Sequence, residues 1–224
     1  MASNAPQLNR KPGKAAPDAP RGRPRASEPS PGSVGAARQI LDAAARLLRQ
    51  RGYEGTTARA IAEEVGLKAG SIYHHFPSKE VIVSTVVNEG VRVVLEAVVK
   101  ALGMLPPDAD PRLRIETAVR LHLLSSLRNS DYTSASIRTF AFLPDQVREN
   151  CRQERRRYED VWRSLVNDAR EAGLIAQGVS VDSVRLMLLG AVNWAGEWYR
   201  PERMSIEKIA HDFATCIVQG RPKP

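Results

Sequence analysis

The sequence predicts an all-α protein, with an N-terminal three-helix head that contains a helix-turn-helix and a larger C-terminal helical body, about nine helices in all. Apolar residues recur three and four positions apart along most of the chain beyond residue 33, which is the period of an amphipathic helix. Glycine and proline separate these segments, and no alternating apolar and polar run indicates a strand. The valine-rich segment 81–99 is expected to be helical despite its β-branched residues, because it is long and carries no turn signal.

The predicted helices follow from their caps and stop signals. In the first half of the chain we expect helices from Ser33 to Gly52, from Thr57 to Gly66, from Lys68 to His75 and from Ser78 to about Gly103. A Pro-Pro break at residues 106–107 ends that half. Beyond it we expect helices over residues 111–129, 131–143, 144–172, 181–199 and 205–219.

Positive charge gathers at the N-terminal end of the chain. The protein has 224 residues, a formal net charge of +8 and a pI of about 9.9. Residues 1–33 carry six Lys and Arg against two Asp and Glu, and residues 34–80 carry seven against five. This distribution favours a nucleic-acid partner, although a solvated basic tail is an alternative.

Residues 1–33 hold seven prolines and few large apolar groups, so we expect a disordered arm. Its run Arg21-Gly22-Arg23-Pro24-Arg25 fits a narrow minor groove, and equally a solubilising tail with non-specific affinity for phosphates. The arm has no apolar core of a signal peptide, and no later apolar stretch is long enough to span a bilayer. We therefore expect a soluble cytoplasmic protein with no membrane partner.

The segment Thr56–Lys79 has the pattern of a helix-turn-helix. Two short helices flank Gly66, and the second carries polar and aromatic side chains on its outer side while Ile72 and Phe76 face inward. Such a unit places its second helix in the major groove of DNA. The sequence thus predicts a DNA-binding domain over residues 34–80 and a ligand-binding and dimerisation domain over residues 81–224.

The ordered motifs of this region resemble the N-terminal domain of the TetR family of bacterial repressors. The resemblance covers about residues 36–83 and rests on the elements Gly-Tyr-x-Gly-Thr-Thr, Ile-Ala-x-x-x-Gly, Gly-Ser-Ile-Tyr-His-His-Phe and Ser-Lys-Glu. It implies an all-α homodimer with a DNA-binding head and an effector pocket in the body. Two-fold symmetry in turn implies a palindromic operator in double-stranded DNA.

The candidate DNA-binding residues are the outward positions of the third helix and the polar groups at the helix ends beside it. Gly70 allows close backbone approach, hydroxyl and imidazole groups can contact bases or phosphates, and Lys79 matches a phosphate-binding lysine of the family. The full set is Thr57, Arg59, Lys68, Ala69, Gly70, Ser71, Tyr73, His74, His75 and Lys79. At the position of Lys68 the family often has Ser or Thr as a helix cap, and lysine cannot cap a helix.

The last two predicted helices resemble the dimerisation pair of the family. Residues 181–199 are apolar nearly all round and contain small residues for close approach, and the final helix carries an apolar face, formed by Ile206, Ile209, Ala210, Phe213 and Ile217. A four-helix interface between two subunits would bury these faces. Packing within one subunit is the alternative.

The stretch from Asn193 to Pro201 resembles a C-terminal signature of family members that control lipid or sterol breakdown and respond to CoA thioesters. An effector pocket would lie among the helices of the body. Its candidate lining residues are Arg120, His122, Arg138, Trp162, Asn193 and Trp194. The arginines over residues 152–157 could meet CoA phosphates, but acidic residues at helical spacing favour a solvated salt-bridged face.

The sequence carries no motif of an enzyme. It has no nucleophile elbow, no phosphate loop and no His or Cys cluster with metal spacing, and Cys151 and Cys216 stand apart. We therefore expect no catalytic activity, no metal and no cofactor. Two other functions stay open, namely a regulator that responds to an unrelated hydrophobic ligand and an architectural DNA binder that tolerates many sequences.

Overall fold

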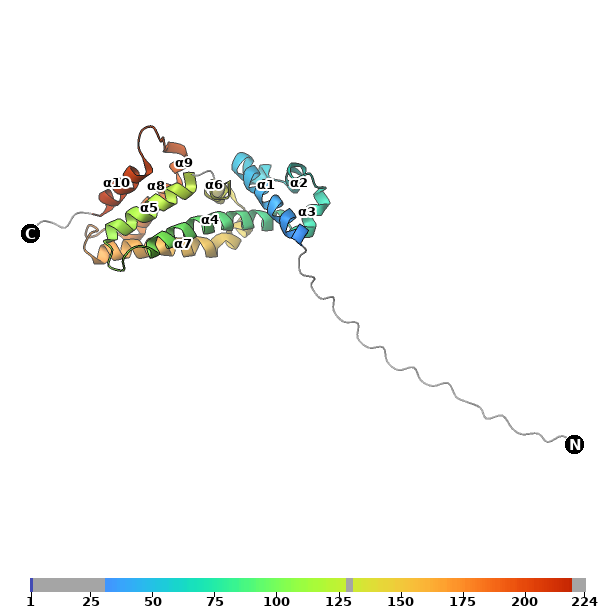
Figure 1. The fold of residues 1–224 in the computed structure, drawn as a ribbon, viewed down its shortest axis with the longest axis horizontal. Helices are drawn as coiled ribbons and strands as arrows, with labels where there is room; N and C mark the ends of the chain where they lie inside the picture. Colours follow the sequence, from blue (N-terminus) through green and yellow to red (C-terminus); the bar gives the residue numbers. More distant parts are fainter. Residues whose placement is uncertain (2–30, 128–130, 219–224) are drawn as a thin grey trace, which may run out of the picture.

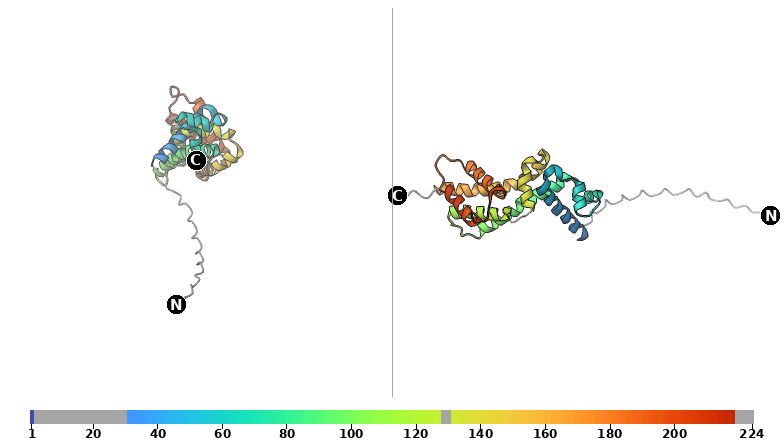
Figure 2. Two further views of the ribbon diagram at one scale, coloured as in Figure 1. Left: turned by 90° about the vertical axis from the view of Figure 1, so that its right-hand side faces the viewer. Right: turned by 90° about the horizontal axis from the view of Figure 1, so that it is seen from above.

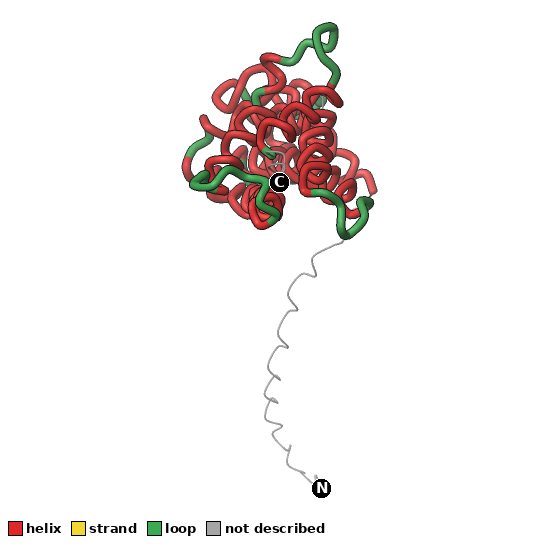
Figure 3. Tube along the Cα trace, turned by 90° about the vertical axis from the view of Figure 1, so that its left-hand side faces the viewer, coloured by secondary structure: helices red, strands yellow, loops and turns green. Residues whose placement is uncertain are grey.

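The computed structural model describes residue 1 and residues 31–127 and 131–218, and within these ranges it contains helices and no strand. Figure 3 shows this all-helical trace, and it confirms the predicted fold class. The N-terminal helices are α1 (Pro31–Gly55), α2 (Ala58–Glu64), α3 (Ala69–His75) and α4 (Lys79–Gly103). The others are α5 (Pro111–Leu127), α6 (Asp131–Thr139), the 3-10 turn η1 (Phe140–Phe142), α7 (Asp145–Glu171), α8 (Val181–Asn193), α9 (Ala195–Trp198) and α10 (Ile206–Ile217).

Two predicted caps and one predicted stop signal of the head are confirmed. The Thr57 hydroxyl accepts a hydrogen bond from the Ala60 N–H at 3.1 Å and caps α2. Ser78 caps α4 in the same way, through the Val81 N–H at 3.4 Å. Gly52 interrupts α1 with a φ of 67°, a left-handed conformation in which glycine costs little.

The start of the first helix and the continuity of the helix over residues 181–199 differ from the prediction. The first helix begins at Pro31 and not at Ser33, because proline at a first helical position lacks only a donor that would be unpaired anyway. The helix predicted over residues 181–199 breaks at Trp194, which separates α8 from α9. Most of the predicted arm, including Arg21 to Arg25, lies outside the described residues, as do the ends of the helices predicted to reach residues 129 and 219.

Two apolar clusters form the interior, and α4 contributes to both. Val91, Val94 and Val98 of α4 pack with α5, α7, α8 and α10. Ile82, Val83 and other residues of its first half pack with α1, α2, α3, α6 and the start of α7. The head lies at one end of the molecule and α4 runs from it into the body (Figure 1 and Figure 2), so the head shares its core with α6 and α7.

The apolar face of α10 is buried inside the subunit. Ile209, Ala210, Ala214 and Ile217 belong to the core cluster, and α10 packs against α5. The alternative of packing within one subunit therefore accounts for these four residues, and a contribution of α10 to a subunit interface stays a prediction. On α8, by contrast, Leu186 and Met187 remain exposed, as does Trp194 directly after this helix.

No helix in the described ranges has both the length and the apolar character needed to cross a membrane. The same ranges contain no group of three or more His, Cys, Asp or Glu side chains arranged to hold a metal ion.

Candidate nucleic-acid interface and candidate effector cavity

A tight turn fixes α3 against the head. Gly66 has a φ of 69°, and the Leu67 N–H donates to the Ala62 carbonyl at 2.9 Å. Ile61 and Ile72 are fully buried and anchor the two helices to α1. The outer side of α3 is therefore held rigidly at the surface.

The polar side of α3 is open to solvent. Ala69, Gly70, Tyr73 and His74 are exposed, and Tyr73 keeps 55% of its surface accessible. Ser71 and His75 are half-buried at the edge of this face. An exposed tyrosine on a short rigid helix makes no contribution to the core, which is the arrangement expected of a group that contacts a ligand.

Lys68 occupies the N-cap position of α3 and makes no capping hydrogen bond with its side chain. This agrees with the sequence prediction. The first turn of α3 thus keeps unpaired N–H groups next to an exposed cation.

The remaining candidates frame this face. Thr57 uses its oxygen as an acceptor in the α2 cap, so its O–H is still able to donate. Arg59 is exposed and forms an ion pair with Glu63 at 2.8 Å. The Lys79 ammonium lies 3.8 Å from the centre of the Tyr53 ring. Burial lowers the pKa of Lys79, and the nearby charges of Glu54 and Glu80 offset part of this shift because they raise it.

The body encloses a cavity of about 430 Å³, including its opening to solvent. Helices α4, α5, α6, α7 and α8 each supply part of its wall. The apolar lining includes Val91, Val94 and Leu189, and the polar lining comprises His122, Thr133, Ser136, Arg155, Tyr158, Glu159 and Asn193. Two of the six predicted pocket residues, His122 and Asn193, thus line the same cavity.

A buried aromatic cluster supports one wall of the cavity. His122 is 1% exposed, and its Nδ1 lies 2.7 Å from the hydroxyl of Tyr158. Trp162 is fully buried and packs edge-on against both rings. Burial lowers the pKa of His122 to about 3 and raises the pKa of Tyr158, so both groups are neutral near pH 7.

The other predicted pocket residues lie elsewhere. Arg138 and Trp194 line a neighbouring groove of about 1130 Å³, which shares Ile137 and Asn193 with the cavity. In that groove Arg138 forms an ion pair with Glu197. Arg120 is half-buried and lines neither space.

Sequence reasoning missed Arg155, Tyr158 and Gly90 as cavity residues. Arg155 lies in a run of charged residues on α7, and that run was compatible with contacts to CoA phosphates but favoured a solvated salt-bridged face. Gly90 interrupts the valines of α4, which is the one signal that could have indicated a close helix crossing there. A Cβ atom at Gly90 would lie 2.3 Å from the Tyr132 carbonyl oxygen.

Two family models match this chain. Residues 40–86 match the model described as bacterial regulatory proteins of the tetR family, and residues 108–221 match a tetracyclin repressor-like C-terminal domain. The chain belongs to the TetR family. Members of this family are transcriptional regulators, and transcriptional regulators are not an enzyme class.

Relatives of this TetR-family chain include named repressors. The transcriptional repressor KstR2 of Rhodococcus jostii (strain RHA1) is 26% identical over 211 residues, which cover 90% of this chain and 98% of KstR2. Among solved structures, the chain is similar to AibR, which was crystallised in complex with isovaleryl coenzyme A and operator DNA. The two share 28% sequence identity with a TM-score of 0.71, and the match covers 81% of this chain and 97% of AibR. The TetR-family regulator PfmR from Thermus thermophilus is 26% identical with a TM-score of 0.67, and covers 83% of this chain and 97% of PfmR.

Proposed function

We propose that this TetR-family protein is a homodimeric repressor that binds a palindromic operator and leaves it when a small-molecule effector, a CoA thioester, occupies the cavity of the body. The observation that carries the proposal is the combination of an exposed, rigidly anchored α3 with a cavity whose wall includes α4, the helix that begins directly after the head. The similarity to AibR, which was solved with a CoA thioester and operator DNA, supports the ligand class. The protein would act in the cytoplasm and catalyse no reaction.

In this proposal the α3 face contacts the major groove. Tyr73, Ser71 and His74 face the bases and phosphates, and Lys68 and Lys79 contribute cations. On DNA, Arg59 would leave its ion pair with Glu63 and bind a phosphate. Both side chains are exposed, and such surface ion pairs are weak.

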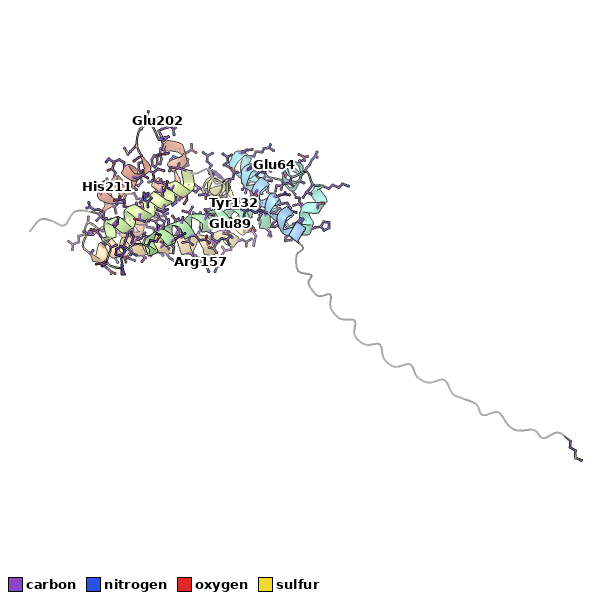
Figure 4. All side chains as sticks on the ribbon, in the orientation of Figure 1. Glu64, Glu89, Tyr132, Arg157, Glu202 and His211 are labelled. Atoms are coloured by element: carbon purple, nitrogen blue, oxygen red, sulfur yellow. The ribbon has the colours of Figure 1, made fainter. Side chains whose placement is uncertain are left out.

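Helix α6 offers a physical link between the cavity and the head. Thr133, Ser136 and Ile137 of α6 line the cavity. At the start of the same helix, Tyr132 donates a hydrogen bond to Asp42 of α1 at 2.7 Å, and Asp131 forms an ion pair with Arg49 of α1 at 2.7 Å. Figure 4 places Tyr132 at the junction of head and body. An effector that binds more tightly to a shifted position of α6 would therefore move α1 and the head.

The test begins with selection of bound duplexes from a random pool, which should enrich a palindrome. Fluorescence anisotropy on that duplex then measures release by isovaleryl-CoA and longer acyl-CoA thioesters, with free coenzyme A as the control. We expect at least one thioester to weaken operator binding at saturation while coenzyme A does not. Release only by a ligand without coenzyme A would favour a regulator of unrelated hydrophobic compounds, and enrichment of no sequence would favour an architectural DNA binder.

A further inference from the structure

Arg155 presents an unpaired cation to the cavity. It lies on α7 and is half-buried, and among the described residues it has neither an ion pair nor a hydrogen-bond partner. Its guanidinium carbon lies 3.8 Å from the centre of the Phe140 ring, which holds the group in place from one side. Burial lowers the pKa of Arg155, and the loss of hydration that causes this is unfavourable unless an anion compensates it.

The acidic residue on the same wall is already engaged. Glu159 follows Arg155 by one helical turn and raises the pKa of Arg155 through its charge. Its Oε2, however, lies 3.4 Å from Nη1 of Arg185, a buried arginine on α8. The pairing of Glu159 with Arg185 leaves Arg155 as the cavity cation that can accept an anion from outside.

The His122–Tyr158 pair adds a free hydrogen-bond donor to the same cavity. With both groups neutral, the pair holds one O–H and one imidazole N–H, and only one of these protons lies in the 2.7 Å bond between them. His122 Nε2 is buried and meets no acceptor at hydrogen-bond geometry within the described residues, although the Asn193 side chain on the cavity wall lies close enough to act on the pKa of His122. A buried polar group without a partner costs free energy that a ligand can recover.

We propose that the cavity recognises a free carboxylate on the acyl part of the effector, bound by Arg155 and assisted by the His122–Tyr158 pair. The effector class would then be CoA thioesters of dicarboxylic acids, an inference that rests on the proposed function and narrows it. The methylene chain would contact Val91, Val94 and Leu189. Arginine matches the planar geometry of a carboxylate with two parallel hydrogen bonds.

The lining of the inner cavity suits an acyl chain better than a phosphate of coenzyme A. Beside its polar groups, the cavity of about 430 Å³ has an apolar wall that includes Val91, Val94 and Leu189, which a strongly hydrated phosphate would have to face. The adjoining groove of about 1130 Å³ is larger, and it meets the cavity at Ile137 and Asn193. In this proposal the coenzyme A moiety would lie along the groove, which opens to solvent, while the acyl group enters the cavity.

Isothermal titration calorimetry with glutaryl-CoA and pentanoyl-CoA tests this inference, because the two thioesters share coenzyme A and a five-carbon acyl chain and differ in the terminal carboxylate. We expect the wild-type protein to prefer glutaryl-CoA. Arg155→Met should reduce that preference roughly 10- to 100-fold, the range expected when charge-assisted hydrogen bonds are removed. Arg156→Met is the matched control, because Arg156 is the exposed neighbour outside the cavity wall, and it should retain the preference.

The alternative outcomes separate the possible errors. An equal loss of both affinities in Arg155→Met would assign Arg155 to a phosphate of coenzyme A and overturn the proposal. The proposal would also be overturned if neither affinity changed. If the wild-type protein does not prefer glutaryl-CoA, or binds neither thioester, this inference is wrong, whereas the CoA class is decided separately by the wider set of acyl-CoA thioesters in the operator-release test. Arg155→Lys provides a second variant should Arg155→Met fold poorly, because it keeps the charge without the planar fork and should retain only part of the preference.

Discussion

His122 makes the stability of this protein sensitive to acid. Its pKa is about 3 in the folded protein because burial disfavours the charged ring, whereas an unfolded histidine has a pKa of about 6.5. Below pH 6.5 the unfolded chain binds a proton that the folded chain refuses. The contribution of neutral His122 to the free energy of unfolding is therefore fully present above pH 6.5. It is lost as the pH falls below 6.5, at about 1.4 kcal/mol per pH unit.

This linkage predicts the behaviour of His122→Gln. Between pH 7 and pH 5 the free energy of unfolding should fall by roughly 2 kcal/mol more in the wild-type protein than in the variant. Urea titrations at the two pH values measure the difference, and circular dichroism at pH 7 confirms the fold of the variant. The same loss in both proteins would mean that His122 binds a proton freely in the folded state.

Gly90 sets the distance between α4 and α6. The nearest atoms to a Cβ at this position belong to the backbone of Tyr132, at 2.3 and 2.7 Å, and backbone atoms cannot move aside as a side chain can. Gly90→Ala should therefore lower the free energy of unfolding by about 1–3 kcal/mol. Gly103→Ala on the same helix is the control, since nothing lies within 4 Å of its added carbon; an equal effect of the two variants would contradict the close crossing.

At the residue scale, exposure on α3 could be predicted from the sequence and the cavity could not. Helical period alone separates Ile72 from Tyr73, because a residue and its neighbour face different sides of a helix. The roles of Arg155 and Tyr158 depend on how α7 packs against α4 and α5, which involves contacts between residues far apart in the chain. Charge patterning on one helix carries no information about such contacts.

Among the elements, α3 begins without a side-chain cap. Lys68 has the extended backbone of an N-cap residue, with a φ of −75° and a ψ of 143°, and lacks the capping bond. Lys68→Ser should supply that bond and raise the free energy of unfolding by about 1 kcal/mol. It should also flatten the dependence of operator affinity on salt, by about 0.9 in the log–log slope for each phosphate that the variant no longer neutralises.

Lys68→Ala serves as the control, because it removes the charge and adds no cap. It should change the salt dependence of operator affinity as Lys68→Ser does. It should not raise the free energy of unfolding, because it adds no capping hydrogen bond. An unchanged salt slope in both variants would exclude Lys68 from the phosphate contacts.

Most elements could be predicted from their caps and stop signals, as Thr57, Ser78 and Gly52 illustrate. The break of α8 at Trp194 could not, because Asn193 and Trp194 are compatible with a continuing helix. In the structure the Trp198 Nε1–H donates to the Ala191 carbonyl at 3.1 Å, a contact that stabilises the bent arrangement of α8 and α9. Tertiary interactions of this kind override local propensity.

For the whole molecule, the exposed side of α8 is the surface on which we expect two subunits to meet. Leu186 and Met187 keep 60% and 57% of their surface accessible, and Trp194 keeps 65%. Leu186, Gly190 and Trp194 follow at intervals of four along one helical face, and Gly190 has nothing within 4 Å of where a Cβ would lie. Such a face allows close approach of a symmetry-related copy.

Leu186→Arg should dissociate the dimer, because it places two like charges near the two-fold axis and removes apolar surface from the interface. Sedimentation velocity measures the mass, and circular dichroism should show an intact fold because Leu186 lies outside the core clusters. Leu113→Arg, at an exposed leucine on α5, is the control and should remain dimeric. A variant Leu186→Arg that stays fully dimeric would place the subunit interface elsewhere.

The most direct test of the account is a fluorescence anisotropy titration of the selected palindrome, with a second duplex in which one half-site is scrambled and a third of random sequence. The account predicts that two subunits bind the palindrome about a thousandfold or more tighter than the random duplex, that scrambling one half-site removes most of this preference, and that Tyr73→Ala weakens operator binding at least about tenfold while the dimer stays intact. Equal affinity of the wild-type protein for all three duplexes would contradict it.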